Sequence, residues 1–368
     1  MEPVPPETPL PKADQTPGTD LTLISVALLL LAVGAFTATF LLPEQSLIVR
    51  PSSTALSAES SAASLIGADE AWSGKGVRVC VVDSGIDLTH PDLQNLELAG
   101  WQDFVNDLNE PYDDHGHGTA MAGLLVANGG LNGLAKEVDL LVAKALSATG
   151  EGLDEDVASA IDWCAQNDAH IISLSLGGAP GALNFLPGSD RASEGSAEQA
   201  IAQGIFVVAA AGNDGGADDD GDVASPSSVQ RVISVGAVHL DGTRWNGSSV
   251  GDNDGRILPL PILLPRQDPN QKPELMAPGQ GVAVLHMESG RWSLVDGTSA
   301  ATVHVTAALA HLLEMQPDMR AGELNNSAEQ TIDEVKEALM NTARPKPGQE
   351  GHDVDLGVPE IVAVLTSS

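Results

Sequence analysis

The sequence predicts an α/β fold, in which a mostly parallel sheet carries helices on both faces and is preceded by one transmembrane helix. Three observations lead to this prediction. Apolar residues make up 42% of the 368 residues, enough to bury a core, and 38 glycines with 23 prolines provide many turns. From about residue 71, strand-like apolar runs alternate with helical stretches, which is typical of parallel sheets. Residues 21–42 form an apolar run that carries no charge.

The N-terminal part divides into three segments by composition. Residues 1–20 contain six prolines and four acids, with Lys12 as the single base, which predicts a disordered tail. At about 1.5 Å per residue, residues 21–42 are long enough to cross a hydrocarbon core of about 30 Å as a transmembrane helix. The alternatives are a cleaved signal peptide, which would have a basic start and a shorter apolar run, and a buried soluble helix. Residues 43–70 are rich in serine and alanine and are predicted to form a stalk, and residues 71–368 one domain.

Periodicity predicts the strands and helices of that domain. The predicted strands are apolar runs: Val77–Val82, Val138–Ala143, His170–Leu174, Ile205–Ala210 and Val232–Val238. The predicted helices are longer stretches of helical spacing: Gly118–Val126, Leu153–Gln166, Ser196–Gln203, Ser299–Met315 and Ile332–Thr342. The apolar stretch 257–265 is interrupted by prolines and is predicted to be an inserted loop or edge ribbon.

Charge and cysteine content exclude several classes of protein. The chain has 51 acids and 17 bases, a net charge of −34, which argues against a nucleic-acid partner and against charge-driven docking on anionic lipid. Two cysteines cannot form a disulfide framework. Cys80 lies in an apolar run and Cys164 in a helical stretch, so both are predicted to be small buried apolar residues rather than a bridge, metal ligands or a nucleophile.

Four polar residues follow predicted strands or begin predicted helices. Asp83 follows the first strand, Asn213 follows the fourth, and His117 and Ser299 stand at the start of helices. Each residue alone also fits a structural role, as a turn residue, a core histidine or a helix cap. Together, at the carboxyl edge of a parallel sheet, they fit a site of nucleophilic catalysis. In such a site an imidazole activates an alcohol, a carboxylate orients the imidazole and an amide donates to an oxyanion.

Six motifs in a fixed order carry a family resemblance. They are Val82–Asp87 with His90–Leu93, His117–Thr119, Ser173–Gly178, Ala209–Asn213, Met276–Gly279 and Gly297–Ser299. Their order, with an asparagine between the histidine and the serine, resembles that of the subtilisin-like serine proteases, or subtilases. The resemblance extends over about residues 71–365, which is most of the chain.

The resemblance implies a three-layer subtilisin-like fold and the activity of a serine endopeptidase. It makes Asp83, His117 and Ser299 the catalytic triad, and Asn213 the oxyanion-hole donor. His115 competes for the role of base, but the glycine and threonine that follow His117 favour His117. The resemblance also implies two sets of substrate-binding residues, an edge that pairs with an extended substrate and the opposite wall of the pocket: Ser175, Leu176 and Gly177, and Ala210, Ala211 and Gly212.

The resemblance also bears on location, partners and cofactors. Because the family mostly acts outside the cytoplasm, we expect a single-pass membrane protein with an extracytoplasmic catalytic domain. The expected partners are a protein or peptide substrate and a membrane, with no nucleic acid. The chemistry requires no cofactor, and a structural calcium stays unassigned, because the loop 128–133 looks shorter than the calcium-binding loop of many relatives. Two residues depart from the family pattern: Ala300 replaces the usual methionine and Val303 the usual proline.

Two other functions remain open from the sequence. A protease-like domain used only for binding would usually have lost a triad member, and an esterase would hold its serine in a Gly-x-Ser-x-Gly elbow, which Ser299 does not occupy.

Five acids follow the predicted oxyanion residue: Asp214, Asp218, Asp219, Asp220 and Asp222. They favour substrates with lysine or arginine before the scissile bond, or they form a solvated turn or a weak cation site.

Overall fold

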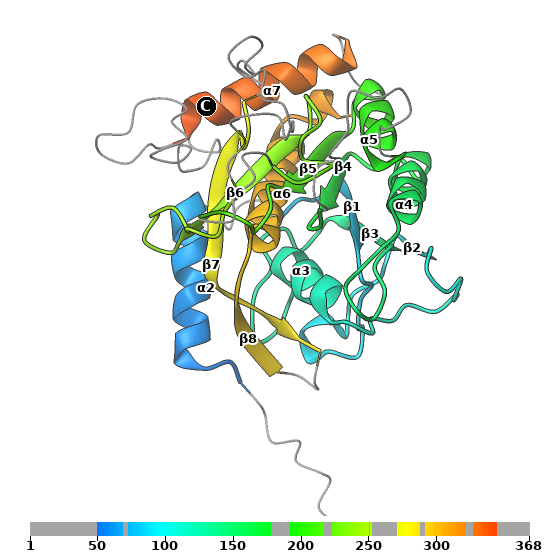
Figure 1. The fold of residues 1–368 in the computed structure, drawn as a ribbon. Helices are drawn as coiled ribbons and strands as arrows, with labels where there is room; N and C mark the ends of the chain where they lie inside the picture. Colours follow the sequence, from blue (N-terminus) through cyan, green and yellow to red (C-terminus); the bar gives the residue numbers. More distant parts are fainter. Residues whose placement is uncertain are drawn as a thin grey trace, which may run out of the picture. The chain divides into compact units, whose positions relative to one another are not determined.

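One sheet of eight strands lies at the centre of the described part of the chain (Figure 1). The computed structural model describes residues 50–68, 73–177, 192–216, 223–249, 251, 271–287, 291–320 and 327–343. The strands are β1 Arg78–Asp83, β2 Gly100–Asp103, β3 Asp139–Lys144, β4 Ile171–Leu174, β5 Phe206–Ala210, β6 Ile233–His239, β7 Leu275–His286 and β8 Arg291–Asp296. Their order is β2-β3-β1-β4-β5-β6-β7-β8, and only the β7–β8 pair is antiparallel.

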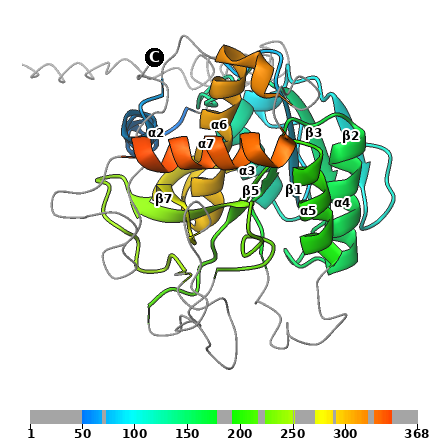
Figure 2. The ribbon, with the colours of Figure 1, turned by 90° about the horizontal axis from the view of Figure 1, so that it is seen from above.

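Helices cover both faces of this sheet (Figures 1 and 2). Their bounds are α2 Ser53–Ile66, α3 His117–Val126, α4 Asp154–Gln166, α5 Ala192–Ala202, α6 Thr298–Met315 and α7 Ala328–Thr342, with short 3₁₀ helices at Pro91–Leu93 and Pro317–Met319. On one face α2, α3 and α6 pack against β7, and α6 reaches β4, β5 and β6 as well. On the other face α4 and α5 pack together, with α7 beside α5. The predicted mostly parallel sheet between two helical layers is therefore confirmed.

All five predicted strands and all five predicted helices are present. Strands β1, β4 and β5 are buried along nearly their whole length, as expected of central parallel strands that read as continuous apolar runs. Strands β2, β7 and β8 were not predicted. Edge strands β2 and β8 are only partly buried and carry mixed polar and apolar residues, so they lack the apolar run that marks the others. In β7 the apolar residues are interrupted by Pro278 and by the three residues after it, Gly279, Gln280 and Gly281.

Helix α2 differs from the predicted stalk. Four residues at helical spacing, Ala55, Ala58, Ala62 and Ile66, are buried, and the helix packs on β7. The Ser52 side chain accepts a hydrogen bond from the main-chain nitrogen of Ala55 at 3.1 Å and so caps the first turn. Gly67 ends the helix with a positive φ of 63°. Part of the segment that reads as a linker by composition thus belongs to the folded unit of residues 50–368.

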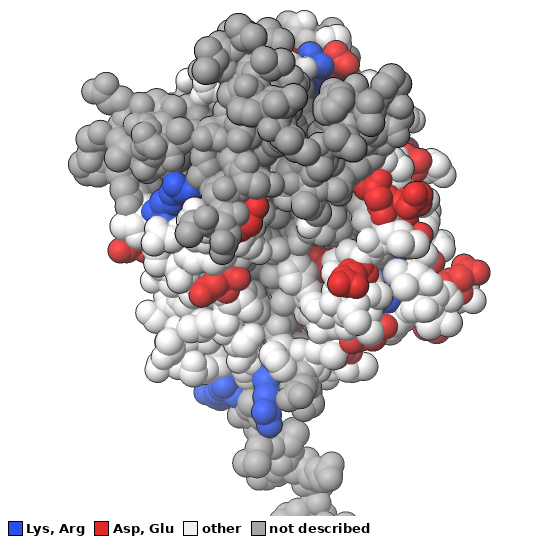
Figure 3. Space-filling view, in the orientation of Figure 1, with Lys and Arg blue, Asp and Glu red and all other residues white. Residues whose placement is uncertain are grey.

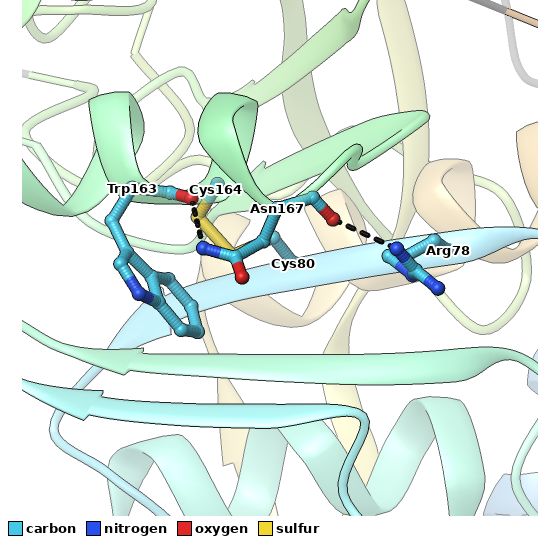
Figure 4. Close-up of a disulfide and its surroundings, with 5 residues drawn as sticks. All are labelled: Arg78, Cys80, Trp163, Cys164 and Asn167. Atoms are coloured by element: carbon cyan, nitrogen blue, oxygen red, sulfur yellow. Dashed lines mark hydrogen bonds between the residues drawn. A yellow bond between two sulfur atoms is a disulfide. The ribbon is translucent and has the colours of Figure 1, made fainter.

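The prediction that the two cysteines are unbridged is wrong. Cys80 and Cys164 are fully buried, as predicted, but they form a disulfide with their Cα atoms 5.8 Å apart (Figure 4). The disulfide joins β1 to α4. A second contact links the same two elements, because Arg78 Nη1 donates to the carbonyl oxygen of Asn167, just beyond α4, at 3.0 Å. The strand that ends at Asp83 is therefore covalently attached to the helix that covers it.

Several predictions fall on segments outside the described ranges. These segments are residues 1–49, with the predicted tail and transmembrane helix, and residues 252–270, with the apolar stretch 257–265. Within the described ranges, no helix combines the length and the apolar character needed to cross a membrane. On the face drawn in Figure 3, acidic side chains are scattered over the described surface, and the few basic ones form no continuous patch there.

Candidate active site

The four residues predicted to carry the chemistry come from four different elements. Asp83 is the last residue of β1, His117 the first residue of α3 and Ser299 the second residue of α6, while Asn213 follows β5. His117, Asn213 and Ser299 line one cavity of about 760 Å³. Asp83 lies behind His117 and is fully buried. The parallel strands bring these residues together at the carboxyl edge of the sheet, as the sequence predicts.

His117 contacts Asp83 through a short two-point interaction. Its Nδ1 lies 2.8 Å from Oδ1 and 2.9 Å from Oδ2 of Asp83. The negative charge of Asp83 raises the pKa of His117, although burial of the ring acts in the opposite direction. The carboxylate thus favours the imidazolium form and fixes Nδ1 as the nitrogen that carries a proton, which leaves Nε2 to act as a base. His115 lies beside His117, with the ring centroids 6.3 Å apart, and it is exposed.

The first turn of α3 is held by Asp113, a residue that was not predicted from the sequence. Asp113 Oδ1 accepts hydrogen bonds from the main-chain nitrogens of His115 and Gly116, and Oδ2 accepts from the main chain and the hydroxyl of Thr119. Burial opposes the charge, but these donors lower the pKa of Asp113 overall. Since Ser84 also donates to Asp113, at 2.9 Å, the carboxylate ties the residue after Asp83 to the helix that begins with His117.

A buried lysine supports the same strand end. Lys144 is the last residue of β3, pairs in register with Asp83 and is fully buried. Its ammonium group donates to the carbonyl oxygens of Ser84 and Leu146, at 2.7 and 2.8 Å, and to the Asp114 carboxylate at 2.6 Å. The lysine therefore fixes the backbone just after Asp83 and the backbone just after β3. A lysine at the end of an apolar strand is the sequence signal that could have indicated this role.

The Ser299 hydroxyl and Ser175 bind each other across the cavity. Ser299 Oγ donates to the carbonyl oxygen of Ser175 at 2.9 Å, and Ser175 Oγ donates to the carbonyl oxygen of Ser299 at 3.1 Å. These reciprocal bonds join the start of α6 to the segment that follows β4. The predicted nucleophile therefore lies at one end of the edge predicted to bind substrate.

The amide of Asn213 is oriented by Thr298. Its Oδ1 accepts from the main-chain nitrogen and from the hydroxyl of Thr298, both at 2.9 Å. Because the oxygen of the amide is bound by the residue before Ser299, the Nδ2 donor faces away from Thr298. A fixed amide donor beside a nucleophilic hydroxyl is the arrangement that stabilises an oxyanion.

Five of the six predicted substrate-binding residues line the cavity: Ser175, Leu176, Gly177, Ala210 and Gly212. Ala211 is not among the residues that line the cavity, and its role in substrate binding stays a prediction. Ala211 is fully buried, its nitrogen donates to the carbonyl oxygen of Val235, and its own carbonyl oxygen accepts from Ala224 at 2.7 Å. Both of its main-chain groups are used inside the protein. The opposite wall instead includes residues that were not predicted: Ala224, Ser225 and Pro226.

Three acidic residues lie on the wall of this cavity, Glu151, Asp154 and Asp214, and no lysine or arginine is among its described lining residues. Two of the acids already bind protein hydroxyls. Asp154 accepts from Ser193, and Asp214 accepts from Ser249. The other acids of the loop after Asn213, at 218–220 and 222, lie outside the described residues. The proposed preference for basic substrates therefore stays a prediction.

Comparisons with known proteins place this geometry in a family. Residues 74–358 match the family model described as Subtilase family. The chain belongs to the subtilase family. It is 32% identical to subtilisin DY of Bacillus licheniformis over 71% of this chain and 85% of that protein. It is also 32% identical to the serine protease AprX of Bacillus subtilis, over 73% of this chain and 61% of AprX.

Solved structures agree with this assignment. Sphericase superposes with a TM-score of 0.61 at 25% identity, covering 82% of this chain and 97% of sphericase. A cold-adapted subtilisin-like serine proteinase superposes with the same TM-score of 0.61 at 23% identity and so supports the fold. This subtilase is accordingly a serine endopeptidase with the α/β fold of the subtilisins.

The loop 128–133 does not fit the calcium site that many subtilases have there. Asp92 is buried beside the loop, and its carboxylate accepts hydrogen bonds from N–H donors: Gly130 at 2.6 Å, Leu131 at 3.0 Å and the Trp292 indole at 2.8 Å. A cation requires oxygen lone pairs that face it, whereas here N–H groups surround an anion. Among the residues described, no three His, Cys, Asp or Glu side chains are grouped to hold a metal ion.

Proposed function

We propose that this subtilase hydrolyses peptide bonds with Ser299 as nucleophile, His117 as general base and acid, Asp83 as the group that orients His117, and Asn213 as oxyanion donor. The observation that carries the proposal is the two-point contact of Asp83 with His117 Nδ1, behind a cavity wall that also contains Ser299 and Asn213. The same order of residues in the family supports it.

In the proposed mechanism, an extended substrate enters along Ser175–Gly177 and redirects the Ser299 hydroxyl from the Ser175 carbonyl to His117 Nε2. Apo serine hydroxyls often reach catalytic alignment only with substrate bound. Nε2 takes the hydroxyl proton as Oγ attacks the carbonyl carbon, and Asn213 Nδ2 donates to the oxyanion that forms. The imidazolium, stabilised by Asp83, then protonates the leaving amine. Water, activated by the same imidazole, hydrolyses the acyl-enzyme ester.

Ser299→Ala removes the nucleophilic oxygen and is expected to lower kcat by about 10⁶-fold while the protein stays folded. Asn213→Ala is expected to be milder, lowering kcat by about 10²–10³-fold, because one of several contributions to the transition state is lost. The measurement is hydrolysis of a quenched peptide, with circular dichroism as the test of folding. Turnover of a folded Ser299→Ala protein at the parent rate would contradict the proposal. If the parent protein folds but shows no turnover, the result would favour the alternative function, a protease-like domain used only for binding.

We also propose that residues 21–42 anchor the protein in a membrane, with the catalytic domain on the extracytoplasmic side. Two observations support this. The run is 22 residues long without a charge. The catalytic domain has a buried Cys80–Cys164 disulfide, and disulfides persist in oxidising compartments.

Labelling by a membrane-impermeant phosphonate that reacts with active serines tests the anchor in intact cells and in lysates. Equal labelling in both is expected, with the label in the membrane fraction. A variant with three residues of 21–42 changed to lysine is the control, and it should leave the membrane fraction. Labelling only after lysis would contradict the topology. Full-length parent protein in the soluble fraction would contradict the anchor.

A further inference from the structure

The edge of the sheet at β8 and the start of the described chain lie at the same end of the molecule (Figure 1). We propose that this end is a membrane-contact face that rests on the surface of a zwitterionic bilayer, an inference that builds on the membrane anchor proposed above. The face consists of Arg50, Arg291, Trp292 and Leu294. The contact holds the catalytic site beside the lipid, so that the enzyme acts on extended segments of proteins anchored in the same membrane.

Packing around Gly130 joins the start of the described chain to β8. A Cβ atom added at Gly130 would lie 2.9 Å from Pro51 Cδ and 2.4 Å from the Trp292 ring. Arg50 precedes Pro51 and Arg291 precedes Trp292, and both arginines are exposed. Figure 3 shows basic side chains at this end of the molecule, although the protein as a whole has a net charge of −34. The beginning of the domain and the last strand of the sheet therefore form one surface with local positive charge.

Strand β8 carries different side chains on its two faces. Ser293 and Val295 line a cavity of about 520 Å³ together with His117 and Ser299. Successive side chains of a strand point to opposite faces, so Leu294, which does not line this cavity, points away from it. Leu294 is 46% exposed, and β8 is the last strand of the sheet. A single strand therefore separates the catalytic site from the membrane-contact face.

The length of chain between the proposed anchor and the domain decides which end faces the membrane. Residues 43–49 separate the charge-free run 21–42 from Arg50. At about 3.5 Å per residue, these seven residues reach at most about 25 Å. A compact domain of about 300 residues is about 50 Å across. The anchor therefore keeps the end that contains Arg50 closest to the bilayer.

The chemistry of the membrane-contact face fits the headgroup region of a neutral lipid. Guanidinium groups pair with phosphate oxygens, tryptophan is favoured at the boundary between membrane and water, and an exposed leucine gains by leaving water. The net charge of −34 opposes adsorption on anionic lipid, so we expect the contact with phosphatidylcholine. A weak contact is sufficient, because the anchor raises the effective concentration of lipid at the face.

Quenching of a fluorescent label by lipid tests the face on the full-length chain. The two cysteines of the chain form a buried disulfide, so the cysteine introduced by Leu294→Cys can be labelled alone with a polarity-sensitive dye. The variant is made in a Ser299→Ala background and reconstituted in phosphatidylcholine vesicles with or without a spin-labelled quencher lipid. Leu108→Cys is the matched control, because Leu108 is 51% exposed and follows β2, at the opposite edge of the sheet.

The dye at position 294 is expected to shift its emission to the blue in vesicles and to lose most of its emission to the quencher lipid. The dye at position 108 should change little in either respect. Adding Arg291→Glu should reduce the quenching at position 294 severalfold, because it places a negative charge where the face meets lipid phosphate.

Cleavage of two substrates tests the consequence for catalysis. One is a quenched peptide free in solution, and the other is the same peptide linked by a lipid tail to the vesicle that carries the enzyme. Leu294→Asp should slow cleavage of the lipid-linked peptide severalfold and leave cleavage of the free peptide unchanged, because Leu294 points away from the catalytic site. Leu108→Asp should leave both rates unchanged.

The outcomes separate this proposal from the anchor and from the protease function. Vesicle-bound protein with equal quenching at positions 294 and 108, or with quenching at neither, would overturn the proposal alone. So would equal slowing of the lipid-linked peptide by Leu294→Asp and Leu108→Asp. Full-length protein that does not float with the vesicles would contradict the anchor and this inference together. A vesicle-bound parent that cleaves neither peptide would contradict the protease mechanism, and quenching in the Ser299→Ala background would still decide the face.

Discussion

Replacing Trp292 by phenylalanine tests whether N–H donors fix the loop 128–133. The indole donates to Asp92 Oδ2 at 2.8 Å, and Asp92 is 4% exposed, so this bond ends on a buried carboxylate. Phenylalanine keeps an aromatic ring next to Gly130 but removes the donor. Hydrogen bonds to charged groups contribute about 1.5–3 kcal/mol, so we expect the free energy of unfolding to fall by about 2 kcal/mol.

For a domain of this size, about 2–4 °C of Tm corresponds to 1 kcal/mol, so Trp292→Phe is expected to lower Tm by about 4–8 °C. The assay is calorimetry in a Ser299→Ala background, which prevents self-digestion. Trp101→Phe is the matched control, because its indole donates to the main-chain oxygen of Leu108 at 3.0 Å, on an exposed loop. The control is expected to lose about 1 kcal/mol or less.

The same experiment with calcium or a chelator examines the nature of the loop. Since the Asp92 carboxylate already binds three N–H donors, millimolar calcium should not restore the Tm of Trp292→Phe. The reasoning fails if Trp292→Phe and Trp101→Phe lower Tm equally. It also fails if calcium raises the Tm of the variant to that of its parent, since that would make Asp92 a cation ligand.

Two further predictions concern the triad and the disulfide. Because Asp83 raises the pKa of His117 and the base must be neutral, kcat/KM should fall as pH drops through a value above that of a free imidazole. Asp83→Asn should shift this decline of kcat/KM to lower pH and reduce kcat by about 10⁴-fold. A pH–rate profile measures both effects. Changing Cys80 and Cys164 together to serine should lower the free energy of unfolding by about 2–4 kcal/mol in urea, since the bridge spans 84 residues. A reducing agent should then destabilise the parent and leave the double variant unchanged; equal urea midpoints would contradict the role of the bridge.

The sequence predicted what depends on local patterns and on their order along the chain. The central strands could be located because burial on both faces makes them continuous apolar runs, and the helices because of their spacing. The parallel sheet then explains why Asp83, His117, Asn213 and Ser299 lie near one another. These predictions needed no knowledge of side-chain contacts.

What the sequence left open depends on contacts between distant residues. The Cys80–Cys164 pairing requires the position of α4 over β1, which the 84-residue separation does not reveal. Asp113 and Lys144 support the site through hydrogen bonds to main-chain atoms, and their neighbours in sequence do not indicate those bonds. The burial of Ala211 follows from the pairing of its main chain with Val235 and Ala224.

Helix α2 determines where a cut could release the catalytic domain. Its buried alanines hold it against β7, and Glu59 accepts from the main-chain nitrogen of Asn132 at 2.5 Å. A nick between Ile66 and Arg78 would therefore leave α2 docked on the sheet, and the two fragments would stay together as a nicked complex. Only cleavage ahead of Ser53 would shed the enzyme intact from whatever precedes it. The docked helix thus makes the position of a cut, rather than its occurrence, decisive for release.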